Sequence, residues 1–126
     1  MSSERRYILL PERPQEFPFS DAVLVDGTLY IAGRIGIDPA TGLAPPEVDK
    51  ELRLLFEGFA STLEHAGMGW DDLVWVQVFS SDLSLWERFN AEYVKRFKKD
   101  FPARAFLGMA SMLRNGRFEM MGIARR

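Results

Sequence analysis

The chain has 126 residues, no cysteine, a formal net charge of -2 and a pI of about 5.4. This length predicts one domain, residues 1–126, that can bury a sizeable core. The acidic balance argues against nucleic acid as a main partner, and the missing cysteine excludes disulfides, thiolate nucleophiles and cysteine-based metal sites. No apolar run reaches the roughly 18 residues of a membrane-spanning helix, and the charged start does not resemble a signal peptide, so we expect a cytoplasmic protein.

The first third of the chain predicts three short strands. Residues 7–10 form the first, and the three prolines within residues 11–21 favour an extended surface loop. Residues 22–25 and 29–32 are apolar strands, and the Asp26-Gly27 pair between them is typical of a hairpin turn.

The middle of the chain changes to a helical period. Apolar residues recur every three or four positions from Glu47 to Ala66, and Gly67 follows as a helix-ending residue. Residues 73–79, rich in β-branched and aromatic side chains, predict a strand. Ser84 and Glu87 have the spacing of a capping box at the start of a second helix, whose aromatic face runs from residue 86 to residue 97. This order of elements predicts a sheet with both helices packed on one face.

The segment from Pro102 to Ala124 predicts a second hairpin. Asn115-Gly116 is a strong signal for a type I′ turn, in which both central residues need positive φ. With these residues as the turn, Met112 lies opposite Glu119, and Arg104 and Glu119 point to the same face. Eight residues separate Arg104 from Met112, or roughly 26 Å along a strand. Both side chains can therefore share a site only if a neighbouring subunit supplies one of them, or if a bulge folds the hairpin sharply.

Short motifs match a known family over nearly the whole chain. The most specific is Pro102-Ala103-Arg104, followed by Asn115-Gly116 and Phe118-Glu119-Met120, which resembles the carboxyl-terminal signature of the Rid family (reactive intermediate deaminases, also called the YjgF or L-PSP family). The other matching segments are residues 17–22, 29–33, 39–42 and 89–93. The resemblance implies an α+β fold like that of chorismate mutase, with a mixed sheet, assembled as a homotrimer with clefts between subunits.

Arg104 and Glu119 are the candidate catalytic residues. In the family, the arginine that matches Arg104 holds the substrate carboxylate, a role that suits the planar guanidinium because it forms two parallel hydrogen bonds. The glutamate that matches Glu119 positions the hydrolytic water. Its apolar sequence neighbours favour partial burial, which raises a carboxyl pKa and allows proton transfer. The alternative interpretation of each residue is a charged side chain on the surface.

Three further positions are candidates for substrate binding. Gly33 matches a family glycine whose backbone lies beside the substrate, although a strand glycine also marks a β-bulge. Phe106 stands where many members carry cysteine, and Phe19 where many carry tyrosine. Ala32 and Ala105 replace family serines, so the pocket is less polar and the substrate's identity stays open.

Other side chains leave fewer functional options. Arg34 is either a salt-bridged surface residue or a contact for a second acidic group on the substrate. His65 is the only histidine, so a zinc site of the usual kind or a two-histidine ribonuclease site cannot be built. The resemblance implies an imine or enamine substrate, and an imine carbon is already electrophilic, so no metal or organic cofactor is expected.

The leading hypothesis is a deaminase that hydrolyses reactive imines or enamines, of the 2-aminoacrylate type, to 2-keto acids and ammonia. Arg104 would hold the substrate carboxylate and Glu119 of an adjacent chain would hold the water. A second hypothesis is a binding protein for small carboxylates without turnover, which the apolar replacements favour. A third is the endoribonuclease activity that the name L-PSP implies, against which the acidic pI and single histidine argue.

Overall fold

The computed structural model describes residues 4–11, 13 and 17–126, and its centre is a mixed sheet of six strands within these residues. The strand order is β1-β2-β3-β6-β4-β5. Only the β4–β5 pair among the strand pairs of this sheet is parallel, and the others are antiparallel. The strands are β1 (Arg6–Ile8), β2 (Ala22–Val25), β3 (Thr28–Ile35), β4 (Leu73–Ser80), β5 (Ala103–Gly108) and β6 (Phe118–Arg125).

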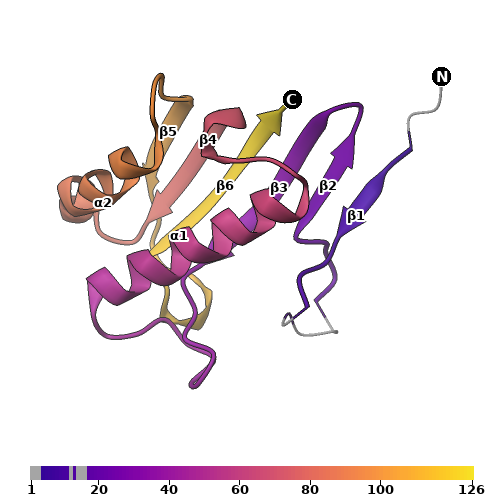
Figure 1. Ribbon diagram of the computed structural model, residues 1–126. Coiled ribbons are helices and arrows are strands. Elements are labelled where there is room, and N and C mark those ends of the chain that lie inside the picture. The colour runs from indigo at the N-terminus through magenta and orange to yellow at the C-terminus, as the bar shows by residue number, and fades with distance from the viewer. Residues whose placement is uncertain (1–3, 12, 14–16) are drawn as a thin grey trace.

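Two helices cover one face of this sheet, as the sequence predicts (Figure 1). Helix α1 (Val48–His65) crosses the central strands, and α2 (Trp86–Tyr93) lies at the β5 edge. Short 3₁₀ turns occupy Trp70–Asp72, Leu83–Leu85, Val94–Arg96 and Leu113–Asn115. No helix in the described ranges has both the length and the apolar character needed to cross a membrane.

The core lies between the helices and the sheet. The apolar stripe of α1 is buried through Leu52, Leu55, Phe56, Phe59 and Leu63, which confirms the periodicity argument. Each such side chain contributes about 1.5–3 kcal/mol when it is fully buried. The aromatic face of α2 joins the same core, because the Phe89 ring lies 5.4 Å from that of Phe56 and 5.3 Å from that of Phe118.

Local turn chemistry is confirmed at two places. Gly67 has a φ of +72° and its N–H donates to the Glu64 carbonyl, which ends α1 where the sequence predicts. Asp26 and Gly27 both have positive φ, 51° and 78°, and join β2 to β3 in a hairpin. A register shift between Ile31 and Arg34 confirms the bulge expected at Gly33, after which β3 continues to Ile35.

The predicted hairpin from Pro102 to Ala124 is wrong. β6 lies between β3 and β4, and β5 pairs with the far side of β4. The left-handed residues are Arg114 (φ 56°) and Asn115 (φ 60°), whereas Gly116 has a φ of -66°. The segment between β5 and β6 is therefore a loop that leads across β4, because burying β6 in the sheet centre outweighs a local turn preference.

Two smaller expectations also need correction. The second helix is shorter than predicted, since α2 ends at Tyr93 and a 3₁₀ turn follows. Its start has no capping box. The Asp82 side chain instead accepts hydrogen bonds from the backbone N–H and the hydroxyl of Ser84. The first strand covers Arg6–Ile8 rather than 7–10, and residues 12 and 14–16 of the expected 11–21 loop lie outside the described residues.

Candidate active site

Arg104 faces the helix side of the sheet, at the edge formed by β5. It pairs in register with Val76, whose side chain is buried beneath the helices. Four aromatic rings surround the guanidinium, with Cζ-to-centroid distances of 4.5 Å (Tyr93), 5.1 Å (Trp86), 5.4 Å (Phe106) and 5.7 Å (Phe89). Cation–π attraction holds such a cation without neutralising it. Arg104 is thus fixed by apolar groups, and burial lowers the pKa of its guanidinium.

A pocket of about 300 Å³ opens beside this guanidinium. Three buried polar atoms here have no hydrogen-bond partner among the described residues: Arg104 Nη1, Tyr93 Oη and Asn90 Oδ1. Burial raises the pKa of Tyr93, and the positive charge of the nearby Arg104 partly offsets that rise. Buried polar groups normally have partners, so these atoms are suited to a polar ligand. The pocket is lined by Asn90, Tyr93, Val94, Phe101, Pro102 and Arg104.

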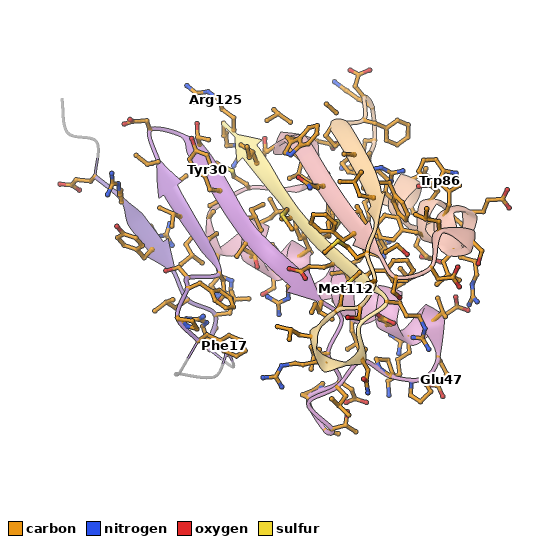
Figure 2. All side chains as sticks on the ribbon, turned by 180° about the vertical axis from the view of Figure 1, so that it is seen from behind. Phe17, Tyr30, Glu47, Trp86, Met112 and Arg125 are labelled. Carbon is orange, nitrogen blue, oxygen red and sulfur yellow. The ribbon has the colours of Figure 1, made fainter. Side chains whose placement is uncertain are left out.

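Glu119 alternates with the buried Phe118 and Met120 along β6, so it faces the opposite, open side of the sheet. Figure 2 looks onto this open face. Glu119 pairs with Ile35 of β3 and Phe79 of β4. Its carboxylate lies against the backbone of Gly33, where an added Cβ would come within 2.1 Å of Oε2. The half-buried position raises the pKa of Glu119, because desolvation disfavours the charged form. A carboxyl group of this kind, when ionised, is a stronger proton acceptor than an exposed one.

A second hollow, of about 290 Å³, lies on the open face next to Gly33. Its walls are mostly apolar and belong to the central strands. Tyr30 at its rim is 51% exposed, which is unusual for a large side chain in the middle of a sheet. The lining residues are Tyr30–Gly33, Trp75, Gln77 and Met121–Ile123.

The expectation that Arg104 and Glu119 share a face is wrong, because it rested on the hairpin. Each residue pairs with β4, Arg104 at Val76 and Glu119 at Phe79. They are therefore two strands and three residues apart, roughly 10 Å in each direction, and on opposite faces. The register agrees with the expectation that the two groups do not meet within one chain.

The other candidate positions divide between these two places. Phe106 lies beside Arg104, with its ring 5.1 Å from that of Trp86. Phe19 lies elsewhere, stacked on Phe17 at 5.1 Å. Figure 2 shows Phe17 at the β1 side of the molecule and Trp86 at the α2 side. Arg34 packs on the helix side, where its guanidinium lies against Gly58 of α1, so it does not face Glu119.

Sequence reasoning missed the role of α2 as the wall of the Arg104 pocket. Trp86, Asn90 and Tyr93 lie three and four residues apart on one helix face, a spacing that by itself indicates only core packing. The signal was a polar Asn90 between the aromatic residues of this face. Within the described part of the chain, no three histidine or acidic side chains gather as a metal site would require.

Comparisons of this chain with family models, with relatives and with solved structures all match the same group of proteins. The family model described as Endoribonuclease L-PSP matches residues 11–126. A Capra hircus protein named 2-iminobutanoate/2-iminopropanoate deaminase is 36% identical over 122 residues, which cover 95% of this chain and 89% of that protein. The Homo sapiens protein of the same name is 34% identical over 122 residues, with the same coverage of 95% and 89%. The crystal structure of a protein of the conserved Rid family from Yersinia pestis superposes with a TM-score of 0.89 at 27% identity, covering 98% of this chain and 100% of that chain.

Proposed function

The chain belongs to the Rid family and is an enzyme of the 2-iminobutanoate/2-iminopropanoate deaminase type, and on that premise we propose its substrate and the residues that act on it. The substrate is a small imine or enamine of the 2-aminoacrylate kind, derived from a 2-amino acid. The products are the 2-keto acid and ammonia. The relatives' names support this substrate class, and the polar atoms described above support where it binds.

Arg104 holds the substrate carboxylate. The observation that carries this assignment is the buried, unpartnered Nη1 of Arg104 beside a pocket of about 300 Å³. A carboxylate accepts two parallel hydrogen bonds from a guanidinium, and the surrounding rings hold the guanidinium in place for them. Phe106 and the backbone near it form the apolar wall next to the bound carboxylate.

Glu119 holds and deprotonates the water that attacks the imine carbon. As the water oxygen bonds to that carbon, Glu119 takes one proton from it and passes the proton to the imine nitrogen, which gives a carbinolamine. The hydroxyl proton then moves to the nitrogen, the C–N bond breaks, and ammonia leaves as the carbonyl forms. The raised pKa of Glu119 makes its carboxylate a better acceptor for the water proton, which it then returns to the imine nitrogen. Gly33 keeps the space that the carboxylate occupies.

One site combines Arg104 of one subunit with Glu119 of its neighbour in a homotrimer. Two observations support this arrangement. The two groups lie on opposite faces of one sheet, and the open face carries an apolar hollow with the exposed Tyr30 at its rim, which assembly would bury. We place the trimer in the cytoplasm, where amino-acid intermediates of this kind arise.

The reaction is tested by generating 2-iminopropanoate with a separate amino-acid-consuming enzyme and following its decay. Wild-type protein should accelerate the decay, Arg104→Ala should not, and the matched control Arg88→Ala should equal wild type because Arg88 forms an exposed ion pair with Asp49. No acceleration by wild type, or equal acceleration by Arg104→Ala, refutes the mechanism.

The shared site is tested by mixing two inactive variants, Arg104→Ala and Glu119→Gln, unfolding them together and refolding them. Random mixing of subunits in a ring gives about one quarter of intersubunit sites with both native groups, so activity should return to about that fraction. If both groups came from the same chain, no mixed site would hold both, and activity would stay absent. Mass measurements that find only monomers at the working concentration would also refute this proposal.

A binding protein without turnover is the alternative that a specific observation favours. Four aromatic rings surround the Arg104 guanidinium, and none of the described residues that line the pocket beside it is acidic, so within one chain this pocket can hold a carboxylate but has no group to activate water. Calorimetric titration with 2-keto acids separates the two functions, because saturable binding without imine turnover would support this alternative. RNA cleavage that survives both Arg104 and Glu119 substitution would support the endoribonuclease function instead.

A further inference from the structure

Glu51 is a fully buried carboxylate that reaches from α1 to the start of β6. Its side chain is 0% exposed. Oε2 accepts hydrogen bonds from the backbone N–H of Arg117 at 2.7 Å and of Phe118 at 3.3 Å. Oε1 accepts a third from Arg117 Nη1 at 2.6 Å. One carboxylate thus binds both the backbone and the side chain of the residue just before β6.

Arg117 extends this connection to the segment before α1. Its Nη1 also donates to the Pro45 carbonyl at 3.0 Å, and its Nη2 donates to the Pro46 carbonyl at 2.5 Å. The Arg117 carbonyl accepts from the Ser81 N–H at 2.9 Å, which ties the same residue to the end of β4. Four parts of the fold therefore meet at the Glu51–Arg117 pair: α1, the segment before it, the end of β4 and the start of β6.

This pair replaces a strand partner that β6 lacks at its start. β3 pairs with β6 only as far as Ile35, opposite Glu119. Gly36 then turns against α1, where a Cβ would come within 2.2 Å of the Glu51 carbonyl oxygen. Beyond that point the N–H groups of Arg117 and Phe118 have no β3 carbonyl to bind, and the Glu51 carboxylate accepts them instead.

The position of Glu119 depends on where β6 begins. The preceding loop contains two consecutive left-handed residues, Arg114 and Asn115, so it does not impose a regular strand direction on the residues after it. Glu119 comes two residues after Arg117, and its carboxylate must lie against Gly33. Holding Arg117 in place therefore sets the register and direction of β6, the strand that carries Glu119.

We propose that Glu51 and Arg117 are positioning residues, which hold the Glu119 carboxylate against Gly33 in the geometry that hydrolysis needs. The inference rests on the proposed function, in which Glu119 activates water. A buried ion pair by itself adds little net stability, because desolvation of both charges offsets their attraction. The distinguishing property of the pair is thus its effect on catalysis in folded protein.

The first test is Glu51→Gln, which keeps the shape of the side chain and removes its charge. A misplacement of about 1 Å can lower a rate by about a hundredfold, so kcat for 2-iminopropanoate should fall between about tenfold and a hundredfold. KM should stay within about twofold, because Arg104 lies on β5, beyond β4. Asp49→Asn is the matched control. It is on the same helix and breaks an exposed pair with Arg88, so kcat should not change.

The decisive measurement is a double-mutant cycle with Glu119→Gln. If Glu51 acts through Glu119, adding Glu51→Gln to Glu119→Gln should lower kcat by less than about twofold. Losses that multiply, or an unchanged kcat in folded Glu51→Gln, overturn the inference. A Glu119→Gln variant with full imine hydrolysis refutes the proposed function itself, which is a different and separately visible failure.

A second variant keeps the test valid if Glu51→Gln does not fold. Arg117→Lys retains the backbone amide and the positive charge, but an ammonium cannot reach Glu51, Pro45 and Pro46 together. With a native circular dichroism spectrum, it should show the same fall in kcat at constant KM, to a smaller degree. Unchanged kcat in this variant also overturns the inference.

Discussion

Replacing Gly33 with alanine would place a methyl group where the Glu119 carboxylate now lies. The new Cβ would be 2.1 Å from Oε2 and 3.0 Å from Cδ of Glu119. Ordinary contacts between such atoms are about 3.5 Å, so Oε2 must move by more than about 1 Å. It can do so cheaply, because it is the end of a flexible side chain and not backbone.

The expected result is a large loss of activity with little loss of stability. Gly33 is not among the residues with positive φ in the described chain, so alanine fits the backbone without strain. Reduced freedom of the unfolded chain contributes about 0.4–1 kcal/mol in favour of folding, which offsets the displaced contacts. A carboxylate moved by about 1 Å should lower kcat/KM by about a hundredfold, or about 2.7 kcal/mol of transition-state stabilisation.

The assay follows 2-iminopropanoate decay and urea unfolding for the same preparations. Gly69→Ala is the matched control, since an added Cβ there meets nothing within 4 Å and its φ of -134° suits any residue. It should keep wild-type activity. Folded Gly33→Ala protein with kcat/KM within about threefold of wild type would refute the assignment of Glu119 as the water-holding group.

Four further predictions concern pH dependence and other parts of the molecule. Burial raises the pKa of Glu119 above its ordinary value of 4.5. The folded state therefore holds the proton to higher pH than the unfolded state, and stability falls as pH rises from the ordinary pKa through the raised pKa. Glu119→Gln should therefore unfold at higher urea concentration than wild type at pH 7.5, and a difference equally large at pH 4 would contradict this. Wild-type activity should also fall as pH drops through the raised pKa of Glu119, a limb that a pH–rate profile would reveal or exclude. Gly58→Ala should change the free energy of unfolding by less than about 1 kcal/mol, because the gain in helix propensity inside α1 offsets the shift of the Arg34 guanidinium, whose Nε would lie 2.3 Å from the new Cβ; a loss of about 3 kcal/mol would show that Arg34 cannot move. Phe89→Ala removes a fully buried ring and should cost about 3–5 kcal/mol, and a thermal midpoint close to that of wild type would be inconsistent with its place in the core.

Features that depend on a few neighbouring residues could be predicted from the sequence. The stripe of α1 follows from side-chain spacing, and its end follows from the left-handed backbone that Gly67 adopts. The Asp26-Gly27 turn needs only two residues that tolerate positive φ. Each of these is decided within one or two turns of chain, so the amino-acid types are enough.

Only part of the candidate site could be predicted from the sequence. The identities of Arg104 and Glu119 came from short motifs, and a strand bulge at Gly33 came from its lack of a side chain. Neither the motifs nor the missing side chain of Gly33 could show that α2 supplies aromatic rings around Arg104, or that the carboxylate of Glu119 lies against Gly33. Those contacts join residues that are far apart in the chain.

The sequence by itself determined most of the helical and extended segments and which residue types carry chemistry. Only the tertiary structure decided that β6 lies between β3 and β4, and so that Arg104 and Glu119 face opposite sides of the sheet. The physical reason is that local backbone preference at Asn115-Gly116 is small, at most a few kcal/mol for a turn residue. Burial of both edges and one face of a central strand sums over many distant contacts, and that sum selects the strand order.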